Sequence, residues 1–325
     1  MIINNFLKTY KHSRFHMPGH HGCALCGSGH YKYDITEISG AGDLYSTSGL
    51  IAQSEQQASR FEEVHTSYSA GGSTLCIQTM AALLKEKGVK KIAAYNDYHV
   101  ALKNACDLLG LDLIETQTLS DVDALWVTSP TYLGKISDIE KIAEQCKQSK
   151  IYLAVDNAHG AHLFDNHPML LGADLCNDSA HKTLPCLTGG AFLHIREDFA
   201  PKSAAKDAML RFGSTSPSYL ILASLENAAE YLKTDAKKDF AKLAQTYAAL
   251  NETAVSHGFQ PQEEQNDITK FVLRKNNMTG AEILKSLHKH KIEPELIGED
   301  YVLLMLSPFN KKKDYKRLNR FFKAY

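Results

Sequence analysis

Short apolar runs alternate along most of this chain with segments whose apolar residues recur at helical spacing. The runs predict buried strands at residues 91–95, 111–114, 124–128, 151–155 and 190–195. The helical spacing predicts helices at residues 55–68, 74–88, 99–109, 137–147 and from 219 onward. Strands that alternate with helices in this way predict an α/β fold with a mostly parallel sheet covered by helices on both faces.

The two ends of the chain show different patterns. Residues 1–50 are rich in Gly, His and Ser and have little periodicity, which predicts an extended N-terminal arm before a large domain at 51–235. A long helix that begins near 233–239 leads into a smaller α+β domain at 236–325. Within that domain we predict a βαβ-like arrangement and a basic terminal helix, at residues 268–273, 280–290, 301–306 and 311–322.

Composition narrows the class of protein. The 325 residues include 36 basic and 37 acidic side chains, so the net charge of −1 favours neither nucleic acid nor an anionic membrane as a partner. We find no apolar run of membrane-spanning length and no signal-peptide pattern at the N-terminus. Seven cysteines, an odd number without framework spacing, favour free thiols in a reducing compartment, and we expect a cytoplasmic protein.

One group of residues in the arm has a spacing that could supply four zinc ligands: His20, Cys23, Cys26 and His30. A glycine-rich arm needs no metal in order to lie against a partner subunit. We therefore favour free thiols and arm histidines, and predict no metal site.

Lys182 is the residue with the strongest chemical signal. It lies between His181 and Thr183, after small residues and before a Pro and a Gly-Gly pair, in a stretch without the charge density of a solvated surface. A lysine held on such a turn can be desolvated, which lowers its pKa and frees the amine to attack a carbonyl. The alternative is a surface or helix-capping lysine.

Two further elements upstream favour the nucleophilic interpretation. Asp156 ends a predicted strand, where ligands bind in open α/β sheets, although it could also be a simple strand-end cap. Ser73 and Thr74 follow two glycines at a helix start and are proposed phosphate ligands together with Ser179; plain helix capping would use the same geometry. A lysine, a carboxylate and a phosphate cradle are the three groups that hold pyridoxal 5'-phosphate (PLP).

Other candidates surround these three groups. Ala158 is small enough for a cofactor ring to lie against it, and His99 at a helix start could stack on the ring, although isolated histidines are more often structural. His181 could shuttle a proton or contact phosphate, and His159 could contact ring substituents or substrate. Ser214 and Thr215 begin another helix and could reach a phosphate across a subunit interface.

The ordered motifs resemble the ornithine/lysine/arginine decarboxylase family from about residue 14 to residue 220. They are Phe-His-Met-Pro-Gly-His, Asp-x-Thr-Glu, Gly-Gly-Ser-Thr, Asp-x-Ala-His-Gly-Ala-His, Ser-Ala-His-Lys-Thr-Leu and Ser-Thr-Ser-Pro-Ser-Tyr. The resemblance implies the PLP-dependent transferase fold of type I, with a large sheet of the seven-stranded type. It also implies a Schiff base on Lys182, Asp156 as partner of the ring nitrogen, and His99 stacked on the ring.

By the same resemblance Ser73, Thr74, Ser179 and His181 match phosphate-side and lysine-flanking positions. Ser214 and Thr215 match a segment that reaches a neighbouring subunit's cofactor, which implies a homodimer with active sites at the interface. The chain departs from the family at His21, where a lysine is common. It also ends at Tyr325, where members usually continue into a further C-terminal domain, so we expect a short form.

We therefore predict a PLP-dependent decarboxylase that converts basic L-amino acids (lysine, arginine or ornithine) into amines and CO2, as in polyamine metabolism. Glu37 or Asp43 is a candidate acid for the distal cation of the substrate. One alternative is another PLP reaction on a different amino acid, by a lyase, aldolase or aminotransferase. A second is a non-catalytic or partner-dependent subunit of the same fold.

Overall fold

The computed structural model describes residues 1–14, 16–23, 29–95, 97–116, 118–262 and 267–325. These residues form two compact units: Met1–Ser129 with Asp138–Thr234, and Pro130–Ser137 with Asp235–Tyr325. The predicted arm and most of the predicted large domain thus lie in the first unit, while the short segment 130–137 belongs to the second.

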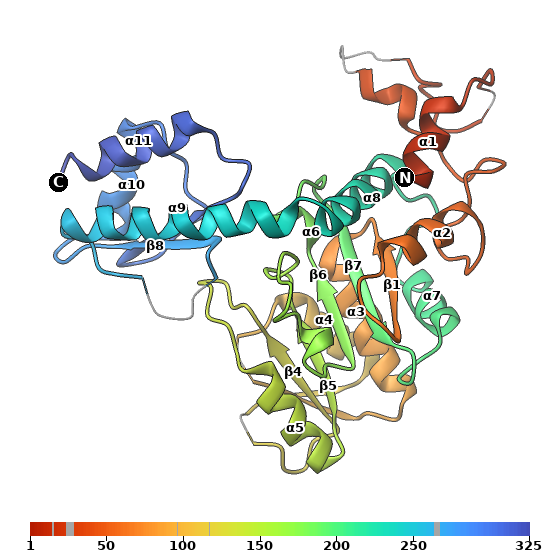
Figure 1. The fold of residues 1–325 in the computed structure, drawn as a ribbon. Coiled ribbons are helices and arrows are strands. Elements are labelled where there is room, and N and C mark those ends of the chain that lie inside the picture. Colours follow the sequence, from red (N-terminus) through yellow and green to blue (C-terminus); the bar gives the residue numbers. More distant parts are fainter. Residues whose placement is uncertain (15, 24–28, 96, 117, 263–266) are drawn as a thin grey trace. The chain divides into compact units, whose positions relative to one another are not determined.

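A seven-stranded sheet in the order β1-β7-β6-β5-β4-β2-β3 forms the centre of the first unit (Figure 1). Its strands are β1 (Val64–Ser69), β2 (Lys91–Ala94), β3 (Asp112–Glu115), β4 (Ala124–Thr128), β5 (Tyr152–Asp156), β6 (Leu175–Asp178) and β7 (Ala191–Arg196). Neighbours from β3 to β6 pair in parallel, and β7 is antiparallel to both of its neighbours. The prediction of a mostly parallel sheet is confirmed.

Helices cover both faces of this sheet. The helical segments of the first unit, not all of which touch the sheet, are α1 (Ile2–Thr9), η1 (Gly29–Tyr33), α2 (Gly49–Ala58), α3 (Gly72–Glu86), α4 (Val100–Leu109), α5 (Ile139–Ser149), η2 (Pro168–Leu170), α6 (Ala180–Thr183), α7 (Lys202–Leu210) and α8 (Tyr219–Lys233). Ala154 and Leu175 pack with α3 and α4 in one core cluster, whereas Val155 and Cys176 pack with α5 in another. Side chains of β5 and β6 therefore alternate between the two faces, as strand geometry requires.

Two local predictions for the first unit are wrong. The predicted helix at 55–68 is instead the end of α2 followed by β1, because the β-branched and aromatic residues of 64–69 pair with β7, where Tyr68 lies opposite Phe192. The predicted extended arm contains α1, whose first turn is capped at long range: the Ile3 and Asn4 N–H groups each donate to the Glu226 carboxylate at 3.0 Å.

The second unit has a three-stranded antiparallel sheet in the order β8-β10-β9. Its elements are α9 (Ala236–Ser256), β8 (Lys270–Arg274), α10 (Gly280–Lys289), β9 (Leu296–Ile297), β10 (Tyr301–Met305) and α11 (Lys312–Phe322). The predicted strands and helices occur, but β8 and β10 are antiparallel rather than the parallel pair of a βαβ unit. None of the helices in the described ranges combines the length and hydropathy that crossing a bilayer requires.

Candidate active site

Asp156 lies at the carboxyl end of β5, buried to 2% exposure, next to the carboxyl end of β6. Its Oδ1 accepts hydrogen bonds from Asn177 Nδ2 at 2.9 Å and from the Ala158 N–H at 3.1 Å. Burial raises the pKa of Asp156, and the Asn177 hydrogen bond and the charge of Lys182 oppose that rise. A cationic or N–H partner would therefore stabilise the ionised carboxylate.

Lys182 lies in the short helix α6, which follows β6 directly. Its Nζ is 3.1 Å from Nε2 of His159, a buried residue in the loop after β5. Since Lys182 also acts electrostatically on the pKa of Asp156, the structure brings the lysine, the carboxylate, Ala158 and His159 together at one edge of the sheet.

The predicted phosphate cradle is the N-terminus of the 15-residue helix α3, with Gly71 as its N-cap. The Ser73 Oγ atom is buried there and has no hydrogen-bond partner among the residues that the structure describes, while Thr74 is exposed. A buried hydroxyl without a partner at a helix N-terminus fits a bound phosphate, which would accept its hydrogen bond.

The Gly189–Gly190 turn connects this cradle to the lysine helix. The Gly72 N–H donates to the Gly189 carbonyl at 2.7 Å, and the His181 N–H donates to the Gly190 carbonyl at 3.3 Å. The close approach depends on Gly72 and Gly189, whose φ angles of 68° and 94° favour glycine. The two predicted halves of the cofactor site are thus held by a single turn.

Ser179 and His181 lie next to the Gly189–Gly190 turn. Nδ1 of His181 is 3.2 Å from the Gly190 carbonyl and 3.3 Å from Oγ of the buried Ser179. Because a carbonyl only accepts, Nδ1 carries the proton, and in neutral His181 the other nitrogen, Nε2, is the acceptor. His181 therefore has the tautomer that a proton carrier at Nε2 needs.

His99 is exposed and caps α4, since its Nδ1 accepts a hydrogen bond from the Ala101 N–H at 3.1 Å. Its charge would act on the pKa of Asp156, which places it near that carboxylate. The capping contact fixes the imidazole at the edge where a ring would lie, and stacking stays a prediction.

Ser214 and Thr215 are both exposed. Ser214 lines a hollow of about 210 Å³ together with Gly71 and Thr74, and its carbonyl accepts a hydrogen bond from the Tyr45 hydroxyl at 2.8 Å. Thr215 is not among the lining residues. Ser214 thus lies beside the cradle of its own chain, and a role for either residue across an interface stays a prediction.

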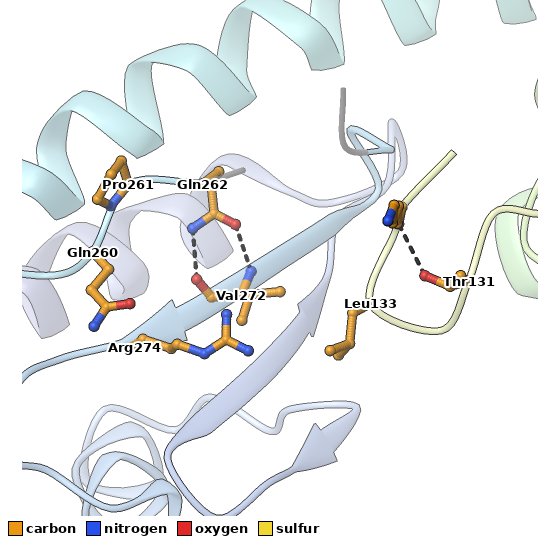
Figure 2. Close-up of a pocket in the computed structure, with 8 residues that line it drawn as sticks. Thr131, Leu133, Gln260, Pro261, Gln262, Val272 and Arg274 are labelled. Carbon is orange, nitrogen blue, oxygen red and sulfur yellow. Dashed lines mark hydrogen bonds between the residues drawn. The ribbon is translucent and has the colours of Figure 1, made fainter. Parts of the chain in front are cut away.

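The second unit contains another hollow, of about 180 Å³, which Figure 2 shows. The side-chain amide of Gln262 accepts from the Val272 N–H at 2.8 Å and donates to the Val272 carbonyl at 2.6 Å, and the Lys135 N–H donates to Thr131 Oγ1 at 3.1 Å (Figure 2). Its lining in the described part of the chain includes no carboxylate. It is a poorer candidate for a PLP site than the edge of the large sheet.

The residues with the spacing of zinc ligands in the arm do not form a described metal-binding group, whereas another group of residues does have ligand atoms close together. In the arm, His20 Nε2 is 3.1 Å from Asp34 Oδ2, Cys23 is an exposed thiol, and Cys26 lies outside the described residues. Within the described ranges, a group with suitable ligand atoms is His167, Asp178 and His194, all buried. Sequence reasoning missed Asp178 and its partners, and also missed Asn177.

Comparisons with known proteins concern most of the chain. The family model described as Orn/Lys/Arg decarboxylase, major domain, matches residues 106–265. An arginine decarboxylase of Bacillus subtilis is 27% identical over 94% of this chain and 72% of its own length. An arginine decarboxylase of Halalkalibacterium halodurans is 29% identical over 73% of this chain and 56% of its own length.

Solved structures show the same fold. The lysine decarboxylase LdcF of Francisella novicida has a TM-score of 0.83 at 17% identity, over 99% of this chain and 59% of its own. A NifS-like protein has a TM-score of 0.70 at 13% identity, over 88% of this chain and 92% of its own. Together with the sheet topology, these matches confirm the predicted PLP-dependent transferase fold of type I.

Proposed function

Because this chain is a relative of the ornithine/lysine/arginine decarboxylases, as its motifs indicated, we propose that it is a PLP-dependent decarboxylase of a basic L-amino acid. The products would be CO2 and the corresponding amine. The observation that carries the proposal is the meeting of Lys182, Asp156 and His159 at the carboxyl edge of the sheet. The Ser73 hydroxyl without a partner supports the same cofactor.

Each residue has a role that its surroundings support. When bound, PLP supplies an aldehyde that an amine can attack and a ring that takes up the electrons of a bond broken at Cα. Asp156 would hold the proton on the ring nitrogen, while Ser73, Thr74 and Ser179 would bind the phosphate. Ala158 and His99 would contact the ring.

Proton transfer falls to the lysine and its two histidine neighbours. A lysine ammonium only donates, so in the 3.1 Å contact His159 Nε2 accepts. A proton passed from Nζ to Nε2 leaves the neutral amine, which is the nucleophilic form. Lys182 Nζ and His181 Nε2 are the candidates to return a proton to the substrate's Cα after CO2 leaves.

A basic substrate needs a negative group for its distal cation. Glu37 and Asp43 are candidates because both lie near Tyr45 and Tyr219. The pKa of each tyrosine is raised mainly by burial, and further by the negative charges of these two acids. Tyr45 lines the hollow beside Ser214 and Thr74, so the acids lie near the cradle. We propose that they select a cationic side chain, and that lysine, arginine and ornithine are the substrates to compare.

The proposal extends to assembly and place in the cell. Ser214 and Thr215 are exposed, which is compatible with a homodimer in which this segment serves a neighbouring cofactor. Free cysteines, among them the exposed Cys23, are compatible with a cytoplasmic enzyme that forms the amines of polyamine metabolism.

Carbon dioxide release from a panel of L-amino acids by the PLP-loaded protein tests the reaction. We expect release from a basic substrate, and a loss of roughly 1000-fold or more in Lys182→Ala. Lys90→Ala, at an exposed lysine, is the matched control. An unchanged rate in Lys182→Ala would contradict the mechanism.

The same panel separates the alternatives. An aminotransferase would consume a keto acid and release no CO2, and an aldolase or another lyase would cleave a different bond. A partner-dependent or non-catalytic subunit would retain PLP poorly, or would lack an active-site wall that another chain supplies.

A further inference from the structure

A second buried carboxylate, Asp178, lies next to Asn177 in β6 and has no assigned role. Asn157 Nδ2 donates to its Oδ1 at 2.6 Å, and Nε2 of His167 and Nε2 of His194 lie 3.1 and 3.2 Å from its Oδ2. The Arg60 guanidinium is 3.8 Å from the same oxygen. We call Arg60, Asn157, His167, Asp178 and His194 the Asp178 cluster.

The cluster and the proposed cofactor residues occupy opposite faces of the sheet. Ala154 and Leu175 share the core of α3 and α4, and two residues further along their strands come Asp156 and Asn177. Val155 and Cys176 face α5, and two residues further along come Asn157 and Asp178. Because side chains alternate along a strand, the Asp178 cluster lies behind the cofactor edge.

The strand ends are tied by two crossed pairs. Asn177 of β6 donates to Asp156 of β5, while Asn157, directly after β5, donates to Asp178 of β6. Each strand end thus contributes one carboxylate and one amide, and the two bonds hold the ends of β5 and β6 from both faces. The relative position of Asp156 and α6 depends on both bonds.

Arg60 extends the cluster to the loop that carries Ala158 and His159. Its guanidinium donates to the carbonyls of Ala161 and Leu163 at 3.4 and 3.3 Å while it lies beside Asp178. The loop also packs tightly on Asn157: a Cβ added at Gly160 would lie 1.9 Å from Asn157 Oδ1. The cluster therefore braces the loop on one side of Lys182 and the start of α6 on the other.

A metal would be the other use of two histidines and an aspartate at this spacing. The Met169 N–H, however, donates to His167 Nδ1 at 3.3 Å, so in the neutral ring the proton lies on Nε2, the atom that faces Asp178. Thr66 Oγ1 lies 3.0 Å from His194 Nδ1 and can donate to it, which again leaves Nε2 as the donor. With Arg60 adding a positive charge, the carboxylate already has cationic and N–H partners, and a metal ion does not fit.

We propose that Asp178 is a positioning residue: through Asn157 and Arg60 it fixes Asp156, His159 and Lys182 in the arrangement that binds the cofactor. The inference rests on the proposed function only for the identity of that cofactor. It assigns no contact with substrate or cofactor to the Asp178 cluster.

Asp178→Asn tests the proposal, with Glu55→Gln as the matched control. Glu55 is also a fully buried carboxylate of the first unit, paired with Lys202 at 3.0 Å and with Lys206. Amide hydrogen exchange of the cofactor-free chains is the first readout. The two variants would be compared at temperatures that give them the same free energy of unfolding. Under these conditions we expect exchange at least about 10-fold faster at residues 156–163 and 179–184 in Asp178→Asn than in Glu55→Gln.

Affinity for PLP, followed by absorbance, is the second readout. We expect about 10- to 100-fold weaker binding in Asp178→Asn and no more than about 3-fold in Glu55→Gln. Equal affinities, with exchange raised evenly over the first unit, would overturn the positioning role. Failure of the wild-type chain to bind PLP would instead overturn the proposed function, and the exchange comparison would still decide the structural part.

If Asp178→Asn does not fold, Arg60→Lys tests whether the Asp178 cluster holds the loop that carries Ala158 and His159. Lysine retains the charge beside Asp178 but loses the planar fork that reaches the Ala161 and Leu163 carbonyls. We expect faster exchange confined to residues 158–163. Exchange unchanged in that loop would contradict the bracing by Arg60. A melting temperature that rises on adding Zn²⁺ to the wild-type chain, but not to His167→Gln, would contradict the metal-free interpretation of the cluster.

Discussion

Each face of the sheet edge carries a buried aspartate bonded to an asparagine, but the pKa of the aspartate is shifted in opposite directions on the two faces. Asp156 and Asp178 are both buried, and each accepts a hydrogen bond from an asparagine at the end of the neighbouring strand. Burial raises the pKa of Asp156. Burial alone would also raise the pKa of Asp178, but the hydrogen bonds and charges of His167 and His194 hold it well below its usual value.

The difference shows that the number of converging donors decides what a buried carboxylate can do. Asp178 is stabilised as an anion by groups of the protein itself, which suits a structural brace. Asp156 is a costlier anion, so a cationic ring nitrogen that bound there would relieve part of the cost. One carboxylate completes the fold, and the other is suited to a ligand.

The largest expected effect is on activity, at Asp156. Asp156→Asn should lower kcat by roughly 1000-fold or more, about 4 kcal/mol, because the ring nitrogen loses its anionic partner. The cofactor-free variant should be as stable as the wild type or up to about 1 kcal/mol more stable, since a costly buried charge is removed. The rate of CO2 release measures the change in kcat, and urea denaturation measures the change in stability. A stability loss above about 2 kcal/mol would mean that Asp156 stabilises the fold as Asp178 does, and would contradict the difference between the two carboxylates.

Asp178→Asn should show the reverse balance in the cofactor-free chain. Removing this anion leaves the half-buried Arg60 without its counter-charge and two buried histidines without their anionic acceptor, and we expect a loss of about 3–5 kcal/mol in the free energy of unfolding. Urea denaturation at pH 7 measures it. A loss below about 1 kcal/mol would mean that the Asp178 cluster contributes little to the fold.

The pH dependence of stability should come in part from His167. Burial lowers the pKa of His167 to about 4, against the opposing pull of Asp178, so between pH 4 and the ordinary value near 6.5 the unfolded chain binds the extra proton. Stability should therefore fall as the pH drops through this window, by about 3 kcal/mol from this residue.

His167→Gln keeps an N–H donor for Asp178 and removes the titration. Its unfolding free energy, compared with that of the wild type from pH 7 to pH 4.5, should decline less steeply. Identical slopes in the two proteins would contradict the assignment.

The smallest expected effect concerns the phosphate cradle. Ser73→Ala removes a buried hydroxyl that has no partner in the described residues, so stability should change by less than about 0.5 kcal/mol, while PLP binding should weaken by about 1 kcal/mol, roughly 5-fold. Ser69→Ala is the control, because its Oγ already bonds the Gly72 carbonyl at 2.9 Å. The control should lose stability instead; equal PLP affinity in Ser73→Ala and wild type would remove Ser73 from the cradle.

Much of the fold and part of the candidate site could be predicted because the signals are local. A strand-end carboxylate at Asp156, a helix start at His99 and the glycines at the start of α3 follow from rules that connect sequence neighbours. The first strand was missed because residues 64–69 become a strand through their pairing with β7, far away in the sequence.

The Asp178 cluster was beyond sequence reasoning for the same reason. Its members come from the segment before β1, the end of β5, the start of η2, and strands β6 and β7, with no spacing that a motif could record. The only local signal is the mirrored order of Asp156-Asn157 and Asn177-Asp178. That order acquires meaning only when β5 and β6 are known to be neighbours.

Covalent trapping would identify the lysine that binds the cofactor. The PLP-loaded protein would be reduced with borohydride, digested and mapped by mass spectrometry. We expect one pyridoxyl-labelled peptide, which contains Lys182, and no such label in Lys182→Ala. A label on another lysine, or none on a protein that has bound PLP, would contradict the assignment of Lys182 as the Schiff-base lysine.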